Sequence, residues 1–421
     1  MTFTEDFLSY VWKHERFSEI SLQAIKGELV SVVKPGVLNN HDGPDFLQAE
    51  IDVDGRKWHG SVELHLKSSD WLKNGHEGDP KYKNVILHVV WEHDCEIPSL
   101  ENVPTIECKN IVHPSTLSKY QSLLQPYQNI PCEKDFESVD EFLRSSWLNR
   151  MLVERLETKT RAIQKDYMNL GSNLNQSFYR LMAKGFGQKV NEAGFDQLSR
   201  KLPVKILLRY SNSLPNLEAL LFGVAGFLND PLDSYMRDLN ERYIHLKRKY
   251  DLQEIEPSTW NFMRLRPANF PTVRLAQLAA LFFKASDFLQ LPNTSPDFAQ
   301  LQKLLKVKAS SYWDNHYRFG KESEISQKWI SKGFFEHLVI NVFVPFVFYY
   351  RRRTGASSFE WVEEVLSNIS PENNKIIRKM TAAGFKNSSA DLSQAIYHLF
   401  QTYCSQSKCL SCALGNAVLK Q

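Results

Sequence analysis

The chain has 421 residues, more than one hydrophobic core usually serves, so we expect two or three domains. Its 51 basic and 48 acidic residues leave a net charge of +3, which excludes a strongly charged chain but neither requires nor forbids a nucleic-acid partner. The N-terminal stretch MTFTEDFLSYVWKHERF has acidic residues where an export signal has a basic start and an apolar core, so we expect a cytoplasmic protein.

The first part of the chain predicts a sheet covered by a helix. Apolar residues recur at helical spacing at Phe7, Leu8, Val11 and Trp12, as in an amphipathic helix that covers a sheet. Strand-like runs follow: ELVSVV, FLQAEIDV, KWHGSVELHLK, the mostly apolar NVILHVVWE and PTIECKNIV. Asp54-Gly55 between the second and third runs predicts a tight hairpin turn, because both residues tolerate positive φ.

From Asp135 onward the periodicity is helical. The predicted helical segments are 140–165, 174–202, 215–249, 272–290 and 325–350, with breaks at Pro203, Pro267 and Pro271. The most apolar run, FFEHLVINVFVPFVFYYRRR, is interrupted by Glu336, His337, Asn341 and Pro345, so we expect a buried helix and no membrane partner. The predicted fold class is therefore α/β (α+β), with an α/β domain over residues 1–132 and a helical domain over 133–421.

Three polar residues alternate along the second strand of the hairpin. Successive side chains of a strand point to opposite faces at ~3.3 Å per residue, so Glu63, His65 and Lys67 share one face about 6 to 7 Å apart. One interpretation is a wall of an active site. The other is the solvated face of an antiparallel hairpin, where alternating polar residues are common.

Asp45 decides between these interpretations. A simple two-residue turn at Asp54-Gly55 pairs Leu47 with Val62, which puts Asp45 opposite Leu64 and on the wrong face to meet Glu63. Asp45 joins Glu63 only if the chain bulges between Pro44 and Leu47, or if Asp45 lies just outside the ladder.

If Asp45 does turn round, it and Glu63 can share a divalent cation, Mg²⁺ or Mn²⁺. The metal activates water for phosphodiester hydrolysis, and the Lys67 ammonium orients or helps to deprotonate the nucleophile. His65 can ligate the metal, particularly Mn²⁺, or pair with a phosphate. Asp45, Glu63, His65 and Lys67 are thus the predicted catalytic residues, and the first three are the predicted metal ligands.

Pro44-Asp45, a hairpin, and a strand with a carboxylate and a lysine together resemble the PD-(D/E)XK phosphodiesterase superfamily, which includes restriction endonucleases and RecB-type exonucleases. The resemblance covers residues 1–115 and implies a restriction-endonuclease-like mixed sheet flanked by helices. It also implies metal ligation by Asp45 and the strand carboxylate, a catalytic Lys67, and a further acid such as Glu5 or Glu28. The sequence departs from the motif at His65, where the family has Asp or Glu.

Over its whole length the chain resembles an uncharacterised bacterial family of unknown function. The similar segments are GPDF, VELHLKSSDW, NVILHVV, IPCE and the cysteine-containing C-terminus. This second resemblance implies no activity.

Cysteines crowd the C-terminus. Cys404, Cys409 and Cys412 have C-x4-C-x2-C spacing, and three thiolates so close can bind one metal with a fourth ligand from elsewhere. We predict Cys132 as that ligand, with Cys108 in reserve. Zinc and a four-iron cluster both suit four thiolates, and unligated buried thiols are the alternative. The pattern is similar to the iron–sulfur staple of certain RecB-like and CRISPR-associated exonucleases.

Two functional hypotheses follow. The first is a metal-dependent nuclease that hydrolyses DNA or RNA with two carboxylates and a lysine on a hairpin. The alternative is a non-catalytic nucleic-acid-binding or scaffold protein on a degenerate nuclease fold, with His65 in place of a lost acid. The sequence leaves the oligomeric state open.

Overall fold

The structure, a computed structural model, describes residues 4–18, 21–39, 41–124, 130–171, 173–290, 294–356 and 359–420. The chain divides into two compact units. The first unit consists of Met1–Trp147, Lys379–Phe385 and Leu399–Gln421, and the second of Leu148–Arg378 and Lys386–His398. The C-terminal cysteines therefore belong to the same unit as the N-terminal sheet.

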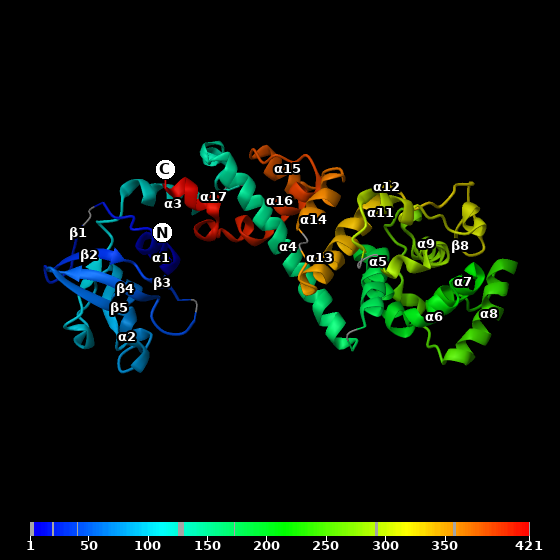
Figure 1. Ribbon diagram of the computed structural model, residues 1–421, viewed down its shortest axis with the longest axis horizontal. Coiled ribbons are helices and arrows are strands. Elements are labelled where there is room, and N and C mark those ends of the chain that lie inside the picture. Colours follow the sequence, from blue (N-terminus) through cyan, green and yellow to red (C-terminus); the bar gives the residue numbers. More distant parts are fainter. Residues whose placement is uncertain are drawn as a thin grey trace. The chain divides into compact units, whose positions relative to one another are not determined.

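A mixed sheet forms the framework of the first unit (Figure 1). Its strands are β1 Ser21–Gln23, β2 Leu29–Lys34, β3 Val37–Leu38, β4 Phe46–Val53, β5 Arg56–Lys67, β6 Val85–Glu92 and β7 Thr105–Glu107. The order is β1-β2-β4-β5-β6-β7, and β3 also pairs with β4. The pairs from β1 to β5 are antiparallel, whereas β5–β6 and β6–β7 are parallel. The predicted α+β class with a mixed sheet is confirmed.

The covering helix is also confirmed. Helix α1, Glu5–Lys13, contacts β5 and buries Phe7, Val11 and Trp12. The other helical segments of this unit, or those that begin in it, are α2 Asp70–Lys73, η1 Pro80–Tyr82, η2 Pro98–Leu100, α3 Pro114–Leu124, η3 Glu133–Ser138, α4 Glu141–Asn169, η9 Cys404–Gln406, η10 Cys409–Ser411 and α17 Ala413–Lys420. Because β5 and β6 are parallel, a crossover must join them, and it carries α2 and η1.

The β4–β5 hairpin changes register partway along. Ala49 pairs with Gly60 as the simple register requires, but Phe46 pairs with Val62. Strand β4 thus has one residue more than β5 between these pairs, which is a β-bulge. The simple pairing of Leu47 with Val62, and with it the placing of Asp45 opposite Leu64, is wrong.

Two neighbouring residues make the bulge possible. Gln48 within it adopts a left-handed conformation with φ 57°, which is uncommon for a residue other than glycine. Gly36, with φ 91°, lies against it: a Cβ there would stand 2.7 Å from the Leu47 carbonyl oxygen. The bulge shifts the register of the residues before it by one position, which brings the Asp45 side chain onto the same face of the sheet as Glu63.

Substitutions at Gln48 test the bulge. We expect Gln48→Gly to leave the free energy of unfolding within roughly 0.5 kcal/mol of the wild type, because relief of the left-handed conformation offsets the greater freedom of the unfolded chain. Gln48→Val should lower it by about 1 to 2 kcal/mol, because a β-branched residue disfavours positive φ. Urea denaturation measures both. Lys57→Val, at an exposed position near the start of β5, is the control, and a Gln48→Val protein as stable as Gln48→Gly would contradict the expectation.

The second unit is largely helical. Besides most of α4, its helices, including two whose ends cross into the first unit, are α5 Leu174–Lys201, α6 Val204–Arg209, α7 Leu214–Val224, α8 Ser234–Tyr250, α9 Pro271–Lys284, α11 Phe298–Leu305, α12 Lys332–Leu338, the π turn η8 Val339–Phe343, α13 Val344–Arg353, α14 Phe359–Ser367, α15 Lys375–Ala382 and α16 Ala390–Thr402. Its short segments are η4 Pro257–Thr259, η5 Pro267–Asn269, η6 Ser286–Gln290, η7 Ser311–Asn315, β8 His316–Arg318 and β9 Lys321–Glu322.

The predicted helix over 215–249 is two helices, α7 and α8. Gly226, with φ 77°, follows α7, and any side chain there would collide with the Ile255 carbonyl. The breaks predicted at Pro203, Pro267 and Pro271 are confirmed, since each of these prolines lies at the start of a helical segment.

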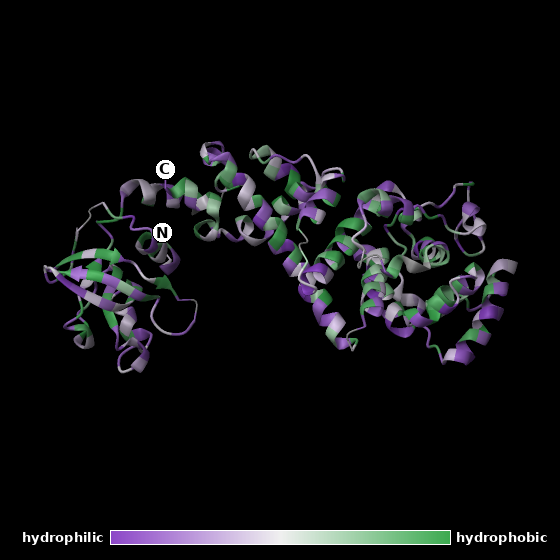
Figure 2. Ribbon diagram, in the orientation of Figure 1, coloured by the Kyte–Doolittle hydropathy of each residue, from purple (hydrophilic) through white to green (hydrophobic). Residues whose placement is uncertain are grey.

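The run Lys332–Arg353 is long and apolar enough to cross a membrane by length and composition alone. In the structure 67% of its most apolar window is buried, as in the core helix of a folded unit. Figure 2 shows hydrophobic (green) colouring along α7, whose side chains from Leu217 to Val224 are buried.

Candidate metal centre

Asp45 and Glu63 lie side by side. The Asp45 N–H donates to Glu63 Oε2 at 3.1 Å, and the Leu64 N–H donates to Asp45 Oδ2 at 2.9 Å. Glu63 is only 5% exposed. Burial and the neighbouring Asp45 charge raise the pKa of Glu63 to about 8, and burial also raises the pKa of Asp45. A cation between the two carboxylates would favour their ionised forms.

Two histidines approach the same carboxylate. Glu63 Oε1 lies 3.5 Å from His65 Nε2 and 3.2 Å from His76 Nε2. One ligand atom from each of these three residues lies within 4.8 Å of the others. His76 belongs to the crossover between β5 and β6, after α2. Sequence reasoning missed it because its position depends on how the crossover folds over β5.

His88 orients His65. His65 Nδ1 lies 2.9 Å from His88 Nε2 on the neighbouring strand β6. Burial lowers the pKa of His65 to about 4 and that of His88 to about 3, so both rings are neutral. When His65 Nδ1–H donates to His88, the lone pair on His65 Nε2 faces Glu63 and is available to a metal. Asn74 Nδ2 at 3.3 Å is a donor to that same lone pair.

Aromatic rings pack around the histidines. The ring of Tyr82 stacks on His76 with centroids 3.9 Å apart, and Trp71 meets His65 and His88 edge to face. These contacts restrict the imidazole orientations, as ligands of a preformed site require.

The structure also chooses between the two further acids. Burial raises the pKa of Glu5 on α1, and Asp45 raises it further. Glu5 in turn contributes to the raised pKa of Glu63. Among the described residues Glu28 has no recorded interaction with either carboxylate. Of the two acids, Glu5 is therefore the one that interacts electrostatically with Asp45 and Glu63.

Lys67 stands apart from the carboxylates. Its side chain is exposed at the end of β5, and its N–H donates to Asp70 Oδ2 at 2.9 Å. Its ammonium charge lowers the pKa of Asp94. Within the part of the chain described, no recorded contact joins Lys67 to Asp45 or Glu63.

The interpretation of this hairpin as a solvated face is wrong. His65 is 1% exposed and Glu63 5%, because β5 continues beyond its hairpin as a central strand beside β6, with the His76 crossover packed over it. Two imidazole nitrogens with carboxylate oxygens are a donor set suited to Mn²⁺, Fe²⁺ or Zn²⁺, whereas Mg²⁺ prefers oxygen ligands alone. The residues present therefore fit a divalent transition metal.

The predicted cysteines come together in the first unit. The thiols of Cys132, Cys409 and Cys412 each contribute to the raised pKa of Cys404. Cys108 is fully buried at the end of β7, and the only charged neighbour recorded for it is Glu107.

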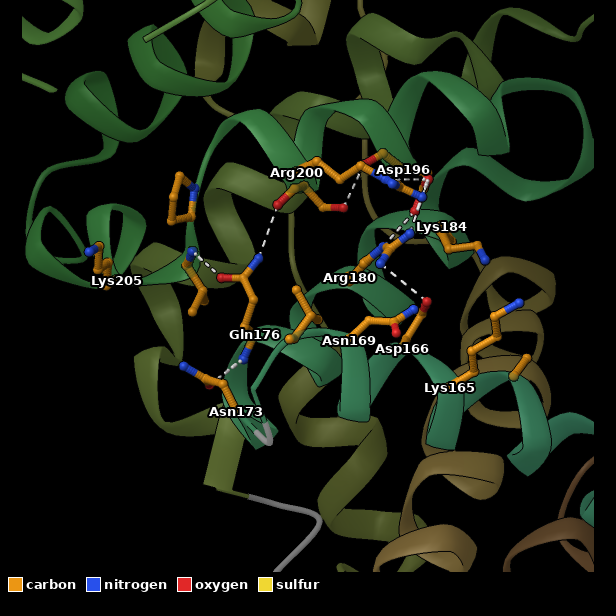
Figure 3. A pocket seen from close by; sticks show the side chains of 15 residues that line it. Lys165, Asp166, Asn169, Asn173, Gln176, Arg180, Lys184, Asp196, Arg200 and Lys205 are labelled. Atoms are coloured by element: carbon orange, nitrogen blue, oxygen red, sulfur yellow. Dashed lines mark hydrogen bonds and ion pairs between the residues drawn. The ribbon is translucent and has the colours of Figure 1, made fainter. Parts of the chain in front are cut away.

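A separate cavity of about 800 Å³ lies in the second unit (Figure 3). Arg180 within it pairs with Asp166 at 3.1 Å and with Asp196 at 2.7 Å. Lys165 and Lys205 also line it, and neither has an ion-pair partner among the described residues. Figure 3 shows these two side chains on opposite sides of the group. The cavity is thus basic.

A family model described as "Protein of unknown function (DUF2851)" matches residues 5–375. The match includes every residue of the metal centre and Cys132 but ends before Cys404. No curated protein and no solved structure matches the chain.

Proposed function

The chain belongs to the DUF2851 family of proteins of unknown function, and from its own geometry we propose that it is a metal-dependent phosphodiesterase that cleaves DNA or RNA. The observation that carries the proposal is the bulge in β4, which sets Asp45 beside Glu63 where the simple register would turn it away. Active sites often use bulges to redirect a side chain in this way.

Each residue of the cluster has a role in this proposal. Glu63, His65 and His76 would hold the metal, and Asp45 would complete its ligands. When bound, the metal supplies an acidified water and positive charge opposite the phosphate. Glu5, whose pKa is raised by burial and by the Asp45 charge, would accept the proton of the attacking water.

The relation to PD-(D/E)XK enzymes is part of the same proposal. It is supported by three features: Asp45 after Pro44, Glu63 on the neighbouring strand β5, and the acid Glu5 on the first helix. Lys67 follows His65 on the same face of β5, and we propose that its exposed ammonium contacts the phosphate of bound substrate.

A cleavage assay tests the function. Purified protein is incubated with single- and double-stranded DNA and RNA in EDTA, Mg²⁺, Mn²⁺ or Zn²⁺. We expect cleavage only with a divalent metal, and faster cleavage with Mn²⁺ than with Mg²⁺, because imidazole ligands favour the softer ion. The absence of cleavage with every metal would remove the catalytic proposal.

Substitution of Lys67 tests its proposed contact. Lys67→Ala should lower kcat/KM about ten- to a hundredfold, chiefly through KM, because the ammonium binds substrate phosphate but no metal ligand. Lys57→Ala is the matched control, since Lys57 is an exposed lysine on the same strand, 3.8 Å from Glu50. Equal effects of the two substitutions would show that Lys67 acts only through general charge.

A second candidate function is nucleic-acid binding without turnover. The basic cavity of the second unit favours a phosphate ligand, since Lys165 and Lys205 there have no ion-pair partner in the part of the chain that the structure describes. Binding would weaken with salt at a slope of about 0.9 per phosphate contacted on duplex DNA. Salt-dependent binding by a protein that shows no cleavage with any of the metals tested would favour this candidate over the first.

A further inference from the structure

Four cysteines from two distant parts of the sequence meet at the C-terminal end of the chain. Cys132 immediately precedes η3, whereas Cys404 and Cys409 begin η9 and η10 and Cys412 immediately follows η10. Helix α17, which follows, contacts η10, η3 and α3, and Figure 1 shows α17 (red) against α3 (cyan). Gly415 packs so closely on the Cys409 carbonyl that no side chain would fit there.

Cys132 and Cys412 are buried, Cys404 and Cys409 are partly buried, and the four thiols interact electrostatically with one another. Burial raises the pKa of Cys132 to about 12, with contributions from Cys412 and Cys409. Burial also raises the pKa of Cys404, and the other three thiols raise it further. Four thiols from two distant segments therefore gather in one place, which is more than the packing of a small core needs, and clustered cysteines of this kind are typical metal ligands.

We propose that Cys132, Cys404, Cys409 and Cys412 hold a four-iron iron–sulfur cluster that ties the C-terminal segment to η3. A single zinc ion with bonds of ~2.3 Å would bring its sulfurs to about 3.8 Å from one another. Among the described residues, however, no three of these sulfurs lie within 4.8 Å of one another. A four-iron cluster suits the wider spacing because each sulfur binds a different iron.

Metal analysis of the anaerobically purified full-length protein tests the proposal directly. We expect about four iron and four sulfide per chain and a broad absorption near 400 nm that is lost on oxidation. One zinc per chain without iron would overturn the cluster. A protein that contains neither iron nor zinc would overturn the whole proposal. The result does not depend on nuclease activity, so it stands or falls separately from the proposed function.

Cysteine substitutions locate the site. Cys409→Ser and Cys132→Ser, on the two separate segments, should each remove most of the iron and the absorption. Cys95→Ser is the control, because Cys95 is a free, partly exposed cysteine of the same unit that lies outside the four. Both ligand variants should also speed proteolysis within 399–420. Cys409→Ser protein that is folded by circular dichroism and keeps its iron would overturn the assignment.

Discussion

Glu63→Gln and Asp45→Asn are each expected to lower the rate of metal-dependent cleavage by about a thousandfold while the protein stays folded. Both changes keep the side-chain volume and remove the negative charge that would hold the cation. Because Glu63 is buried beside Asp45, loss of its charge removes repulsion as well as a ligand. The fold should therefore tolerate the change, unlike a cavity-forming substitution.

A matched control is available on strand β4. Glu50 is a glutamate on this strand that pairs with Lys34 at 2.9 Å and lies 4.0 Å from His59, and among the described residues it has no recorded contact with His65 or His76. Glu50→Gln should leave cleavage unchanged. Rates measured at saturating Mn²⁺, with thermal denaturation of each variant, separate chemistry from folding. Cleavage by Glu63→Gln at the wild-type rate would mean that the cluster is not the catalytic centre.

The metal-free protein is expected to lose stability as pH rises. The pKa of Glu63 is about 8 in the folded chain against an ordinary value of 4.5, so the unfolded chain releases the proton first. Below pH 4.5 this glutamate is protonated in both the folded and the unfolded chain, and its contribution to the free energy of unfolding is fully present. Between pH 4.5 and 8 that contribution is progressively lost, up to about 5 kcal/mol in total.

Urea denaturation in EDTA across this pH range measures the effect. Glu63→Gln cannot titrate, so its free energy of unfolding should vary much less with pH than that of the wild type. Added Mn²⁺ should restore wild-type stability at high pH, because metal binding displaces the proton and strengthens as pH rises toward 8. The same pH dependence in wild type and Glu63→Gln would place the titrating group elsewhere.

Local patterns predicted much of the fold. The helical spacing from Phe7 to Trp12, the turn at Asp54-Gly55 and the apolar strand around Leu87 depend on neighbours a few residues away. Such signals survive in a single sequence because they follow from the periods of helix and strand. The division of 215–249 into α7 and α8 was missed, since Gly226 needs its positive φ only once Ile255 packs against it.

The metal centre was only partly predictable. The face shared by Glu63 and His65 followed from the strand period, but their burial did not. It arises because β5 pairs in parallel with β6, and parallel pairing is set by a crossover of seventeen residues, 68–84, whose path the sequence does not state. His76 reaches Glu63 along that same crossover.

By itself the sequence determined the ligand types available, the hairpin that carries Glu63, and the close spacing of Cys404, Cys409 and Cys412. The tertiary structure decided that Asp45 faces Glu63, that His76 joins them and that Cys132 meets the C-terminal cysteines. The physical reason is the distance along the sequence over which each kind of interaction acts. Strand and helix periods act over a few residues, whereas a bulge at a non-glycine residue and contacts between distant segments are stabilised only by the packing of the whole unit.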